Sequence, residues 1–477
     1  MSAPMTSQAL AAEVARRLAE RRGEFAVLGL GRSGRAAARM LRAAGLSVYV
    51  SDQSTSPATQ AAAAELEAAG AGVQVGGHDL ERIARAALLV VSPGIPPEVP
   101  ACAAARAAGV PIVSEVEVAL RLLPGLRVIA TTGTNGKTTT TALIGHLLRA
   151  LGHDAADVGN IGTAVSEIAL RPSVPQWLAL ELSSFQLHDT PGILPDVGVL
   201  TTLSPDHLDR YASVAEYYAD KARLFANASG SSRWVVTADN ADVTAMTAGV
   251  AGTIYRFSTV RTDVDAFQHP DTGWLHVLGA PLVPGTALAL PGAHNVANAL
   301  AALLAVMVAD PSHRTPEARA VLAAAIATFG ALPHRLEPVA NRDGVLWLND
   351  SKATNVASAM VAVSAMTRPA IVLLGGRHKG EPYTTLVPAL QAHAKVVLAY
   401  GEAAPQILDD LRGLGGQIPV EDWHGATFTA VVERARALAT SGDVVLLSPA
   451  CSSYDMFPNF EVRGRQFAEL AAGAGGA

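Results

Sequence analysis

The stretch Arg127-Val-Ile-Ala-Thr-Thr-Gly-Thr-Asn-Gly-Lys-Thr138 joins an apolar, β-rich run to a glycine loop that ends in Gly-Lys-Thr. A helix-like segment, Thr139–Leu151, follows the loop directly. A glycine loop between a strand and a helix aims backbone N–H groups at phosphates, and the terminal lysine and hydroxyl suit phosphate oxygens and Mg²⁺. The full pattern has glycine at position 131, where this chain has threonine. We therefore predict an α/β unit whose loop binds ATP; the alternative is a loop that merely turns.

Two further strand-turn-helix openings lie on either side of this loop. One is Phe25-Ala-Val-Leu-Gly-Leu-Gly-Arg-Ser-Gly34, and the other is Ala370-Ile-Val-Leu-Leu-Gly-Gly376. A chain of 477 residues has room for about three domains. The sequence therefore predicts an α/β protein with three domains, at residues 1–117, 118–331 and 332–477, with linkers near Pro124 and Pro333.

The first opening carries Gly29, Gly31 and Gly34 in a GxGxxG spacing, and Asp52 ends the next strand-like run, Leu46–Asp52. Such glycines let the backbone approach a pyrophosphate at a helix N-terminus, and the acid can bind a ribose hydroxyl. The pattern fits NAD, FAD and UDP-sugars equally well, and glycines needed only for tight packing are the alternative. Taken alone, this motif favours a dehydrogenase.

Composition excludes several classes of protein. Half of the residues are hydrophobic and the mean hydropathy is +0.27, largely because of alanine. The most apolar helical stretch, Val296–Ala309, is interrupted by Asn298 and is shorter than the roughly 20 residues of a membrane span. The net charge of −6 argues against wrapping nucleic acid. Cys102 and Cys451 cannot form a disulfide framework, and no signal peptide is evident, so we expect a cytoplasmic protein.

Several motifs follow the second glycine loop in order: Gly159-Asn-Ile-Gly162, Glu181-Leu-Ser-Ser-Phe-Gln-Leu187, Asp206-His-Leu-Asp-Arg210 and His294-Asn-Val-Ala-Asn298. With them the chain resembles the Mur ligases, ATP-dependent amino-acid-adding enzymes of peptidoglycan synthesis, from Gly29 to the region of Gly464. It is most similar to the branch that adds D-glutamate to UDP-N-acetylmuramoyl-L-alanine. The resemblance implies an amide ligase that transfers the γ-phosphoryl group of ATP to a carboxylate and lets an amine attack the acyl phosphate. It also implies a Rossmann-like UDP-binding domain, a central P-loop ATP domain and a C-terminal Rossmann-like domain that binds the amino acid and closes on ATP.

The resemblance also assigns roles to individual residues. Lys137, His207, Lys221 and Arg335 would be catalytic, and Arg335 would reach the γ-phosphate when the third domain closes. The ATP site would comprise Gly133, Thr134, Asn135, Gly136, Lys137, Thr138, Thr139, Asn295, Arg335, Asp350 and Lys352. Two Mg²⁺ ions would be held by Thr138, Glu181, His207 and a carbamate formed from CO₂ on Lys221. An anionic carbamate suits a metal site that an ammonium group would repel.

The remaining implied residues meet the two other substrates. The UDP-substrate would contact Gly31, Arg32, Ser33, Asp52, Asn160, Ser183 and His207. D-Glutamate would contact Thr354, Lys379, Ser453 and Phe460. Arg32-Ser33 and Arg377-His378 depart from other members, which leaves the fine contacts to uracil and glutamate open.

Ordinary structural roles are the alternative to these assignments. Judged by sequence alone, Lys221 is a solvated helix residue and His207 a core or surface residue. Asn160, Ser183, Asn295 and Asp350 suit turns or helix caps. Another Mur ligase, a folylpolyglutamate synthetase-like enzyme and a non-catalytic ATP-binding regulatory protein are the alternative functions. The Asp-Asn-Pro-Arg motif of the diamino-acid-adding members is absent. We expect a monomer without a nucleic-acid partner.

Overall fold

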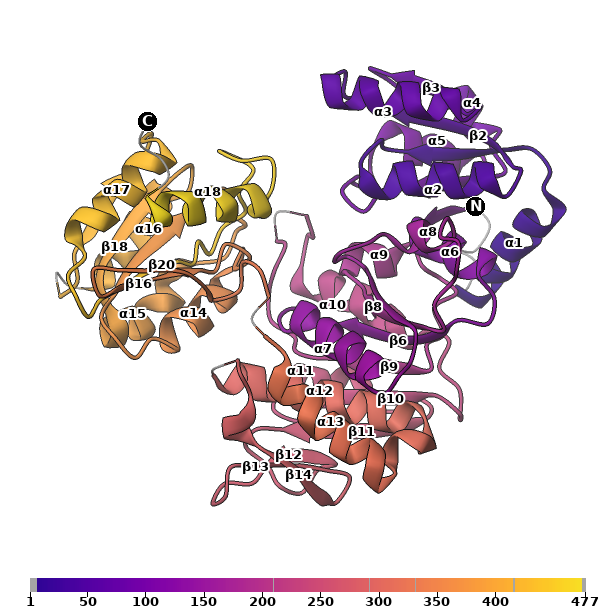
Figure 1. Cartoon of the computed structure of the whole chain (residues 1–477). Helices are drawn as coiled ribbons and strands as arrows, with labels where there is room; N and C mark the ends of the chain where they lie inside the picture. The colour runs from indigo at the N-terminus through magenta and orange to yellow at the C-terminus, as the bar shows by residue number, and fades with distance from the viewer. Residues whose placement is uncertain (1–6, 209, 291, 331, 415–416, 474–477) are drawn as a thin grey trace. The chain divides into compact units, whose positions relative to one another are not determined.

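The computed structural model describes residues 7–208, 210–290, 292–330, 332–414 and 417–473. The chain divides into two compact units. Unit 1 comprises the residues up to Leu203 together with Ala215–Ala287 and Val296–Ala327, and unit 2 comprises Ser204–Val214, Leu288–Asn295 and the residues from Thr328 onward. Figure 1 shows the helices and strands of both units. Three sheets carry the fold, two in unit 1 and one in unit 2, as far as the described residues go.

The N-terminal sheet of unit 1 has five parallel strands among the described residues, in the order β3-β2-β1-β4-β5. Successive residues of β1 point to opposite faces, as the two-residue period of a strand requires. Phe25 and Val27 pack in one core with α2 and α3, whereas Ala26 and Leu28 pack in another with α4 and α5. The elements of this part are α1 (Ser7–Glu20), β1 (Glu24–Leu28), α2 (Arg32–Ala43), β2 (Ser47–Asp52), α3 (Pro57–Ala68), β3 (Gly72–Val75), α4 (Leu80–Ala84), β4 (Leu88–Val91), α5 (Pro100–Ala107), β5 (Ile112–Ser114) and α6 (Glu115–Leu122).

The central sheet of unit 1 runs in the order β14-β13-β12-β11-β10-β9-β6-β8-β7. The strands from β12 to β7 are parallel, and β13 and β14 add an antiparallel edge that the sequence did not predict. Its strands are β6 (Arg127–Thr132), β7 (Ala155–Gly159), β8 (Trp177–Glu181), β9 (Val197–Leu200), β10 (Arg233–Thr237), β11 (Thr253–Ser258), β12 (Ala266–Gln268), β13 (Trp274–Val277) and β14 (Ala280–Pro284).

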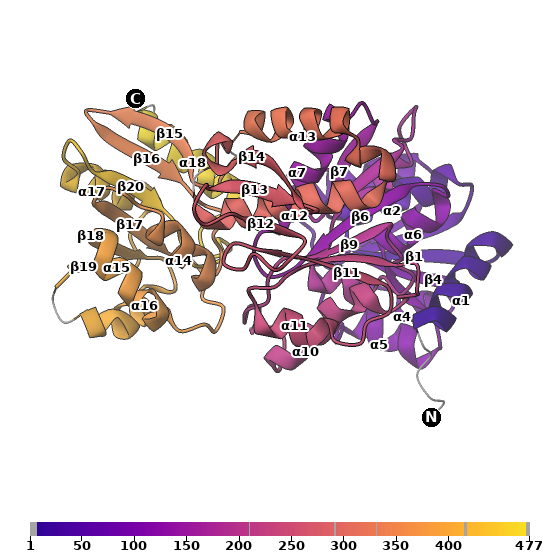
Figure 2. The same ribbon diagram turned by 90° about the horizontal axis from the view of Figure 1, so that it is seen from below.

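The helices of this central part include the segment that we predicted to be buried. It forms α12 (Ala293–Ala309), and its residues from Asn298 to Ala309 are buried. Asn298 accepts a hydrogen bond from the Thr140 hydroxyl of α7 (Lys137–Ala150), so the two helices lie side by side, as Figure 2 also shows. The other helices are α8 (Val165–Ile168), α9 (Ser184–His188), α10 (Val214–Ala222), α11 (Ala241–Thr247) and α13 (Pro316–Thr328). No helix among the described residues is long and apolar enough to span a bilayer.

Glu115 ties the two sheets of unit 1 together. It begins α6, directly after the last strand of the N-terminal sheet, and its carboxylate accepts hydrogen bonds from the backbone N–H groups of Val165 and Ser166 at 3.3 and 2.9 Å. The hydroxyl of Ser166 donates to the same carboxylate. Burial raises the pKa of Glu115. A buried carboxylate that accepts several hydrogen bonds is costly to disrupt, so this contact fixes α8 against the N-terminal domain.

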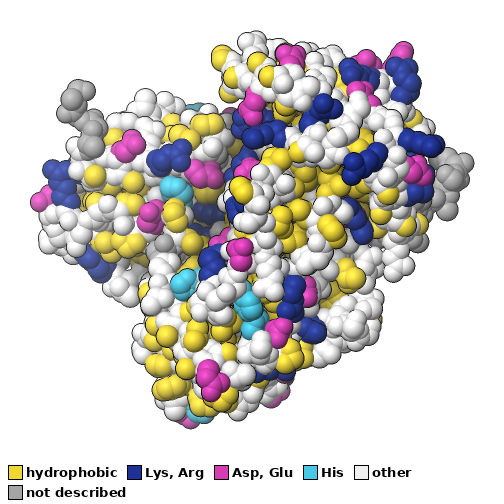
Figure 3. All heavy atoms as spheres, turned by 45° about the vertical axis from the view of Figure 1, so that its right-hand side comes forward, with side chains coloured by type: hydrophobic (Ala, Val, Ile, Leu, Met, Phe, Trp, Pro, Cys, Tyr) yellow, Lys and Arg dark blue, Asp and Glu magenta, His cyan; other side chains and the backbone are white. Residues whose placement is uncertain are grey.

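The sheet of unit 2 has the order β15-β16-β20-β17-β18-β19 and is parallel except for the β15–β16 pair. Val372 and Leu374 of β17 pack with α14, α15 and α16, whereas Ile371 and Leu373 pack with α17 and α18. The elements are β15 (Glu337–Arg342), β16 (Val345–Asn349), α14 (Val356–Ser364), β17 (Ala370–Gly375), α15 (Val387–His393), β18 (Ala394–Tyr400), α16 (Ala404–Asp410), β19 (Val420–Trp423), α17 (Phe428–Leu438), β20 (Val444–Leu447) and α18 (Phe460–Ala472). The predicted α/β architecture is confirmed. On the face in Figure 3, basic and acidic side chains are interspersed.

Candidate active site

The Gly-Lys-Thr loop leaves β6 and enters α7 in unit 1. Gly133 and Gly136 have φ values of 142° and 84°, a region that favours glycine. A Cβ atom on Gly133 would lie 2.1 Å from Oγ1 of Thr201, and one on Gly136 would lie 2.5 Å from Oδ1 of Asn298. Both glycines are therefore required by the backbone path and by the close approach of neighbouring side chains.

Two threonines at the end of β9 hold the loop in place. The hydroxyl of Thr201 donates to the carbonyl of Asn135 at 2.5 Å. Thr202 accepts from the N–H of Thr134 through its carbonyl at 2.7 Å and from the N–H of Asn135 through its hydroxyl at 3.0 Å. Sequence reasoning missed both threonines. The signal for them in the sequence is a pair of threonines directly after the buried apolar run of β9. This strand pairs with β6, which leads into the loop.

The side chain of Lys137, the first residue of α7, contacts the phosphate loop that precedes the helix. Its Nζ donates to the carbonyl oxygens of Gly133 at 2.8 Å and Thr134 at 2.7 Å. Thr138 and Thr139 are buried in the first turn of α7, a helix of 14 residues. A positive side chain beside a helix N-terminus is an arrangement that attracts phosphate groups.

Glu181 is the last residue of β8. This strand pairs with β6, which leads into the phosphate loop. The side chain of Glu181 is 1% exposed. The side-chain amide of Asn160 donates to Oε1 of Glu181 at 2.7 Å, whereas Oε2 is buried and has no hydrogen-bond partner among the described residues. A buried carboxylate oxygen left without a partner is costly, and hard oxygen ligands are what Mg²⁺ prefers. Together with the Thr138 hydroxyl, the donor set fits Mg²⁺.

Lys221 is buried, at 1% exposure, so the interpretation of it as a solvated helix residue is wrong. It lies near the end of α10, and its Nζ donates to the carbonyl oxygen of Gly133 at 2.8 Å. The same Nζ lies 4.5 Å from the centroid of the Tyr217 ring, whose hydroxyl donates to Oγ1 of Thr134 at 3.2 Å. The structure therefore brings Lys221 to the phosphate loop, as the assignment of a catalytic role requires.

The first glycine loop leads from β1 into α2. A Cβ atom on Gly34 would lie 1.9 Å from the carbonyl oxygen of Gly29, so Gly34 permits close packing of the helix on the loop. A Cβ atom on Gly31 would have no neighbouring atom within 4 Å. Asp52 shapes this loop, because Oδ2 accepts from the N–H of Leu30 at 2.6 Å and Oδ1 from that of Ser54 at 2.8 Å. Arg32 and Ser33 occupy the first turn of α2.

Two further residues predicted to meet the UDP-substrate lie in the central domain. Asn160 follows β7 and holds Glu181, as described above. Ser183 caps α9: its hydroxyl accepts from the N–H of Gln186, and the side chain of Gln186 accepts in return from the N–H of Ser183. Ser183 therefore fills the capping role that its residue type favours.

His207 belongs to unit 2, where its φ of 57° places it in the left-handed region. Its N–H donates to Oδ1 of Asp206 at 2.8 Å. Asp206 is buried, accepts from the side-chain amide of Asn355 at 2.8 Å, and lies 3.5 Å from Nζ of Lys379. Asp206 thus links His207 to Lys379, the predicted D-glutamate residue. Sequence reasoning missed Asn355, although it follows Thr354 directly.

Arg335 lies between two residues of unusual backbone conformation. His334 and Leu336 have φ values of 63° and 42°. The N–H of Leu336 donates to Oδ1 of Asp350 at 3.2 Å, and the side-chain amide of Asn349 donates to Nδ1 of His334 at 2.8 Å. Strained residues persist only where their surroundings hold them, so this loop is fixed on both sides of the arginine.

Asp350 is buried and accepts a second hydrogen bond, from the Ser448 hydroxyl at 2.8 Å. Burial raises its pKa to about 7. Nζ of Lys352 lies 5.3 Å from the centroid of the Phe460 ring. A residue predicted for the ATP site therefore lies beside one predicted to contact D-glutamate. Thr354 is half-buried and donates its N–H to the carbonyl of Lys352 at 2.9 Å.

The other predicted residues of unit 2 are Ser453 and Asn295. Ser453 is buried, and its carbonyl accepts from the N–H groups of Met456 and Phe457 at 3.1 and 2.8 Å. Asn295 lies inside the first turn of α12, because the helix begins at Ala293. The alternative role of Asn295 as the cap of that helix is therefore wrong.

Unit 1 thus holds the phosphate loop, Glu181, Lys221 and the residues predicted to meet the UDP-substrate other than His207. Unit 2 holds His207, Asn295, Arg335 and the predicted ribose and D-glutamate residues.

Comparison with known proteins places this arrangement in a family. Three family descriptions match: "Mur ligase MurD-like, N-terminal domain" at residues 23–114, "Mur ligase middle domain" at 131–306 and "Mur ligase, glutamate ligase domain" at 334–451. A UDP-N-acetylmuramoylalanine--D-glutamate ligase of Acidobacterium capsulatum is 39% identical over 456 residues, which cover 94% of this chain and 96% of the relative. The enzyme of the same name from Myxococcus xanthus is 41% identical over 93% of this chain and 97% of the relative.

Solved structures agree in fold. The UDP-N-acetylmuramate-alanine ligase MurC of Thermotoga maritima matches with a TM-score of 0.60 at 19% identity, over 95% of this chain and 100% of that chain. MurF of Acinetobacter baumannii matches with a TM-score of 0.59 at 14% identity, over 98% and 99%. With sequence relatives matched over nearly their whole length and all three domain types present in order, the chain belongs to the Mur ligase family.

Proposed function

We propose that this chain is an ATP-dependent ligase that joins D-glutamate to UDP-N-acetylmuramoyl-L-alanine in the synthesis of peptidoglycan precursors. The γ-phosphoryl group of ATP passes to an oxygen of the L-alanyl carboxylate, and ADP leaves. The amino group of D-glutamate then attacks the acyl carbon, phosphate leaves with its electron pair, and the amine loses a proton. The observation that carries the proposal is the phosphate loop, whose carbonyl oxygens bind Nζ of Lys137, together with the nearby buried carboxylate of Glu181. One oxygen of this carboxylate has no hydrogen-bond partner among the described residues.

Phosphoryl transfer depends on positioning and on stabilising negative charge more than on covalent catalysis. The loop from Gly133 to Thr139 supplies backbone N–H groups at the N-terminus of α7, and Lys137 supplies a positive charge held at the loop. Arg335 supplies a planar guanidinium group that suits the γ-phosphate. We assign the ribose to Asp350, the phosphate side to Lys352 and the adenine to Asn295.

Glu181 and Thr138 are the residues of unit 1 that hold Mg²⁺ in this proposal, and His207 serves a second ion. When bound, Mg²⁺ neutralises the charge that develops on the phosphate oxygens. Asn160 orients the carboxylate of Glu181 by occupying Oε1, which leaves Oε2 for the metal.

Carbamylation of Lys221 is part of the proposal. Nζ of Lys221 and Nζ of Lys137 both donate to the carbonyl oxygen of Gly133. Two ammonium groups directed at one carbonyl repel each other, especially where burial removes solvent screening. A carbamate on Lys221 replaces one of the positive charges by a negative one, so it supplies anionic oxygens where the metal binds and relieves the repulsion.

Unit 2 carries the residues that we assign to D-glutamate: Thr354, Lys379, Ser453 and Phe460. Lys379 is buried beside Asp206, so its charge is already oriented before a carboxylate arrives. The UDP end is assigned to Gly31, Arg32, Ser33, Asp52, Asn160, Ser183 and His207. We further propose that the enzyme acts as a cytoplasmic monomer.

The test measures phosphate release by the purified protein with UDP-N-acetylmuramoyl-L-alanine, ATP and Mg²⁺, with D-glutamate, L-glutamate, lysine or diaminopimelate added in turn. Release that requires D-glutamate supports the proposal. Equal turnover with another amino acid indicates another Mur ligase activity, and no release with any of them indicates a protein without this catalysis. The Lys137→Ala variant is expected to be at least about 100-fold slower, because the lost charge raises the barrier by roughly 3 kcal/mol.

A further inference from the structure

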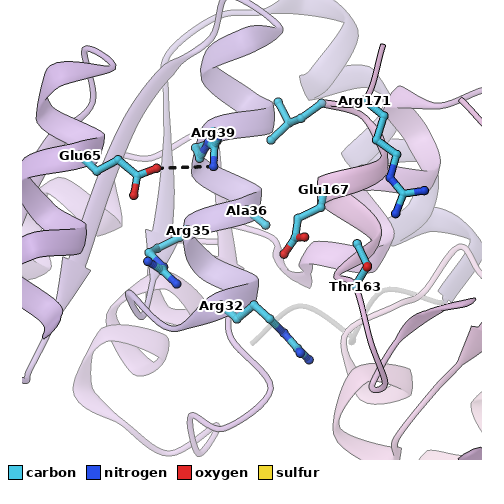
Figure 4. A pocket seen from close by; sticks show the side chains of 9 residues that line it. Arg32, Arg35, Ala36, Arg39, Glu65, Thr163, Glu167 and Arg171 are labelled. Atoms are coloured by element: carbon cyan, nitrogen blue, oxygen red, sulfur yellow. Dashed lines mark ion pairs between the residues drawn. The ribbon is translucent and has the colours of Figure 1, made fainter. Parts of the chain in front are cut away.

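The cavity between α2 and α8 in unit 1 belongs to the UDP end of the proposed site. Its volume is about 350 Å³, and Figure 4 shows Arg32, Arg35 and Arg39 of α2 on one side and Glu167 and Arg171 on the other. Because Arg32 is already assigned to the UDP-substrate, the cavity is part of that end of the site. Unit 2 is where contacts remain without an assigned role.

Two loops of unit 2 that carry residues predicted to contact D-glutamate lie side by side. One loop follows β17 and carries Lys379, and the other follows β20 and carries Ser453. The two strands are parallel neighbours in the sheet, so their carboxyl ends, where the loops begin, lie together. Both residues are buried. D-Glutamate has two carboxylates, which need donors at a matching separation.

The backbones of the two loops are joined directly. The N–H of Arg377 donates to the carbonyl oxygen of Ser452 at 2.9 Å, and the N–H of Ser452 donates in return to the carbonyl oxygen of Arg377 at 3.1 Å. A Cβ atom on Gly376, whose φ is 132°, would collide with the carbonyl oxygen of Ser452, so glycine permits this close approach. The side chain of Arg377 is exposed and pairs with Glu402 at 3.0 Å. Arg377 therefore joins the loops through its backbone, which most residue types can supply.

His378 adds a link between side chains. Its Nδ1 lies 3.0 Å from the hydroxyl oxygen of Tyr383, and that oxygen lies 2.9 Å from Sγ of Cys451. Tyr383 and Cys451 are buried, at 1% and 0% exposure, whereas His378 is half-buried. A chain of hydrogen bonds therefore runs from the loop of Lys379 through Tyr383 to the loop of Ser453.

The direction of these hydrogen bonds follows from burial. Burial raises the pKa of the Cys451 thiol to about 12 and also raises the pKa of Tyr383, so both groups keep their protons at neutral pH. Sulfur is a weak acceptor, so the thiol donates to the tyrosine oxygen and the tyrosine hydroxyl donates to Nδ1 of His378. The N–H of Tyr383 donates to Oδ2 of Asp410 at 2.8 Å, which anchors the tyrosine to α16. An acceptor at position 378 therefore completes the chain.

We propose that His378 and Tyr383 are positioning residues that set the separation of Lys379 and Ser453, so that the site selects an amino acid of the length of glutamate. The inference rests on the proposed function, because that function assigns Lys379 and Ser453 to D-glutamate. The competing explanation is that His378 and Cys451 merely satisfy a buried hydroxyl group. One partner is enough for that purpose, whereas Tyr383 has two, one from each loop.

The first experiment measures steady-state kinetics of the full chain with varied D-glutamate. His378→Ala and Tyr383→Phe are each expected to raise the KM for D-glutamate at least about 5-fold, the scale of one lost hydrogen bond, and to change kcat less than about 2-fold. His378→Asn should recover most of the loss, because its amide oxygen is an acceptor near the place of Nδ1. His393→Ala, at the end of α15 in the same unit, is the matched control and should behave as the wild type.

Selection by length is tested with D-aspartate and D-2-aminoadipate, which are one methylene shorter and longer than D-glutamate. Each is added as a competitor, and its inhibition constant is compared with the KM for D-glutamate. The preference for D-glutamate should fall at least about 3-fold in His378→Ala and Tyr383→Phe and be retained in His378→Asn. A merely structural role would weaken the binding of all three amino acids alike.

Hydrogen exchange of the free chain gives a readout that does not depend on activity. The N–H groups of Arg377 and Ser452 should exchange faster in His378→Ala and Tyr383→Phe than in the wild type and the His393→Ala control. Thermal unfolding checks that each variant is folded. If Tyr383→Phe is not, the two substitutions of half-buried His378 provide the test.

The inference is overturned if His378→Ala leaves both the KM for D-glutamate and the preference unchanged, or if all three amino acids are affected alike. Failure of the proposed function has a different result, namely that the wild type releases no phosphate with D-glutamate while exchange in the two loops still differs between the variants. In that case the link between the loops stands, and the selection of glutamate falls together with the proposed function.

Discussion

Lys137 and Lys221 each place Nζ 2.8 Å from the same acceptor, the carbonyl oxygen of Gly133. The two lysines come from separate helices, α7 and α10, and Lys221 is buried. One loop carbonyl therefore organises both positive side chains of the phosphate site. In the proposed mechanism, this geometry makes the rate of the reaction depend on the charge state of Lys221.

Lys221→Ala is expected to lose activity by roughly 100-fold or more, because the anionic oxygens of the proposed carbamate disappear from the metal site. Short carboxylic acids such as acetate should restore part of the rate, since they supply carboxylate oxygens in the space left by the side chain. The measurement is the rate of phosphate release with increasing acetate concentration. Lys395→Ala, which alters an ion pair in unit 2, is the control and should respond to acetate no more than the wild type. An unchanged rate in the Lys221→Ala variant would contradict the assignment of Lys221 to the metal site.

Asn160→Ala should raise the Mg²⁺ concentration needed for half-maximal activity by about 10–100-fold, the usual cost of removing a residue that orients a metal ligand. The physical reason is that Oε1 of Glu181 loses the donor that orients the carboxylate. The rate is measured against Mg²⁺ concentration. Asn227→Ala is a suitable comparison, because the side-chain amide of Asn227 donates to the backbone carbonyls of Pro191 and Ile193. Identical Mg²⁺ dependence in the Asn160 variant and the wild type would contradict the orienting role.

Two glycines of the first loop should respond differently to alanine. Gly34→Ala is expected to lower the free energy of unfolding by about 2–4 kcal/mol, because the new Cβ meets the carbonyl oxygen of Gly29 at 1.9 Å. Gly31→Ala should cost less than about 1 kcal/mol, since nothing lies within 4 Å of its Cβ position. Denaturant unfolding measures both. Gly31→Ala should instead raise the KM for the UDP-substrate, and equal destabilisation by the two variants would refute this division of roles.

Asp350 predicts a pH dependence of stability. Burial raises its pKa to about 7, whereas an unfolded aspartate titrates near pH 4. Between these values the unfolded chain has released the proton and the folded chain still binds it, so stability falls as pH rises from about 4 to 7 and levels off above 7. Asp350→Asn removes this contribution. The difference in unfolding free energy between wild type and variant should therefore change by up to about 4 kcal/mol over that range, to the disadvantage of the wild type.

The measurement for Asp350 is denaturant unfolding at a series of pH values from 4 to 8. The exposed Asp343, in the turn between β15 and β16, provides the control substitution Asp343→Asn. It should leave the pH profile unchanged. A wild-type profile that runs parallel to that of Asp350→Asn would disprove the raised pKa.

Arg335→Ala is expected to lower kcat by roughly 100- to 1,000-fold with a smaller change in the KM for ATP, because in the proposed mechanism the guanidinium group acts mainly on the charge of the transferred phosphoryl group. Arg335→Lys should recover only part of the loss, since lysine lacks the planar fork. Steady-state kinetics with varied ATP measure both constants. Arg342→Ala, at the exposed end of β15, should behave as the wild type.

The elements around each glycine loop could be predicted because their determinants are local. A buried apolar run, a glycine turn and a helix follow one another at β1–α2 and at β6–α7, and both exist within a few residues of the predicted bounds. The edge formed by β13 and β14 escaped prediction, since its pairing rests on hairpin contacts rather than on a long apolar pattern. Local patterns also suggest that Lys221 is solvated, whereas in the structure it is buried and donates to the carbonyl of Gly133, 88 positions away in the chain.

The contacts that complete the site come from residues far apart in the chain. Thr201 reaches Asn135 across 66 positions, and Asn355 reaches Asp206 across 149. No spacing rule within the sequence links such pairs. Asp52 is the reverse case, because the motif predicts the residue itself, whereas the hydrogen bonds that its carboxylate accepts from the N–H groups of Leu30 and Ser54 are seen only in the structure. Motifs thus identified the chemistry of these residues, whereas their supporting partners became visible only in three dimensions.

The division into two units has a consequence for how the chain can be cut and rejoined. The backbone passes between the units at positions 203/204, 214/215, 287/288, 295/296 and 327/328. A fragment that starts at residue 328 therefore lacks Asp206, the acceptor of the hydrogen bond from Asn355 and the partner of Lys379. Exchanging C-terminal regions between related enzymes at a single junction would separate these partners. Recombination within the family is thus expected to tolerate a crossover near residue 328 only when the parents agree in the segments 204–214 and 288–295 as well.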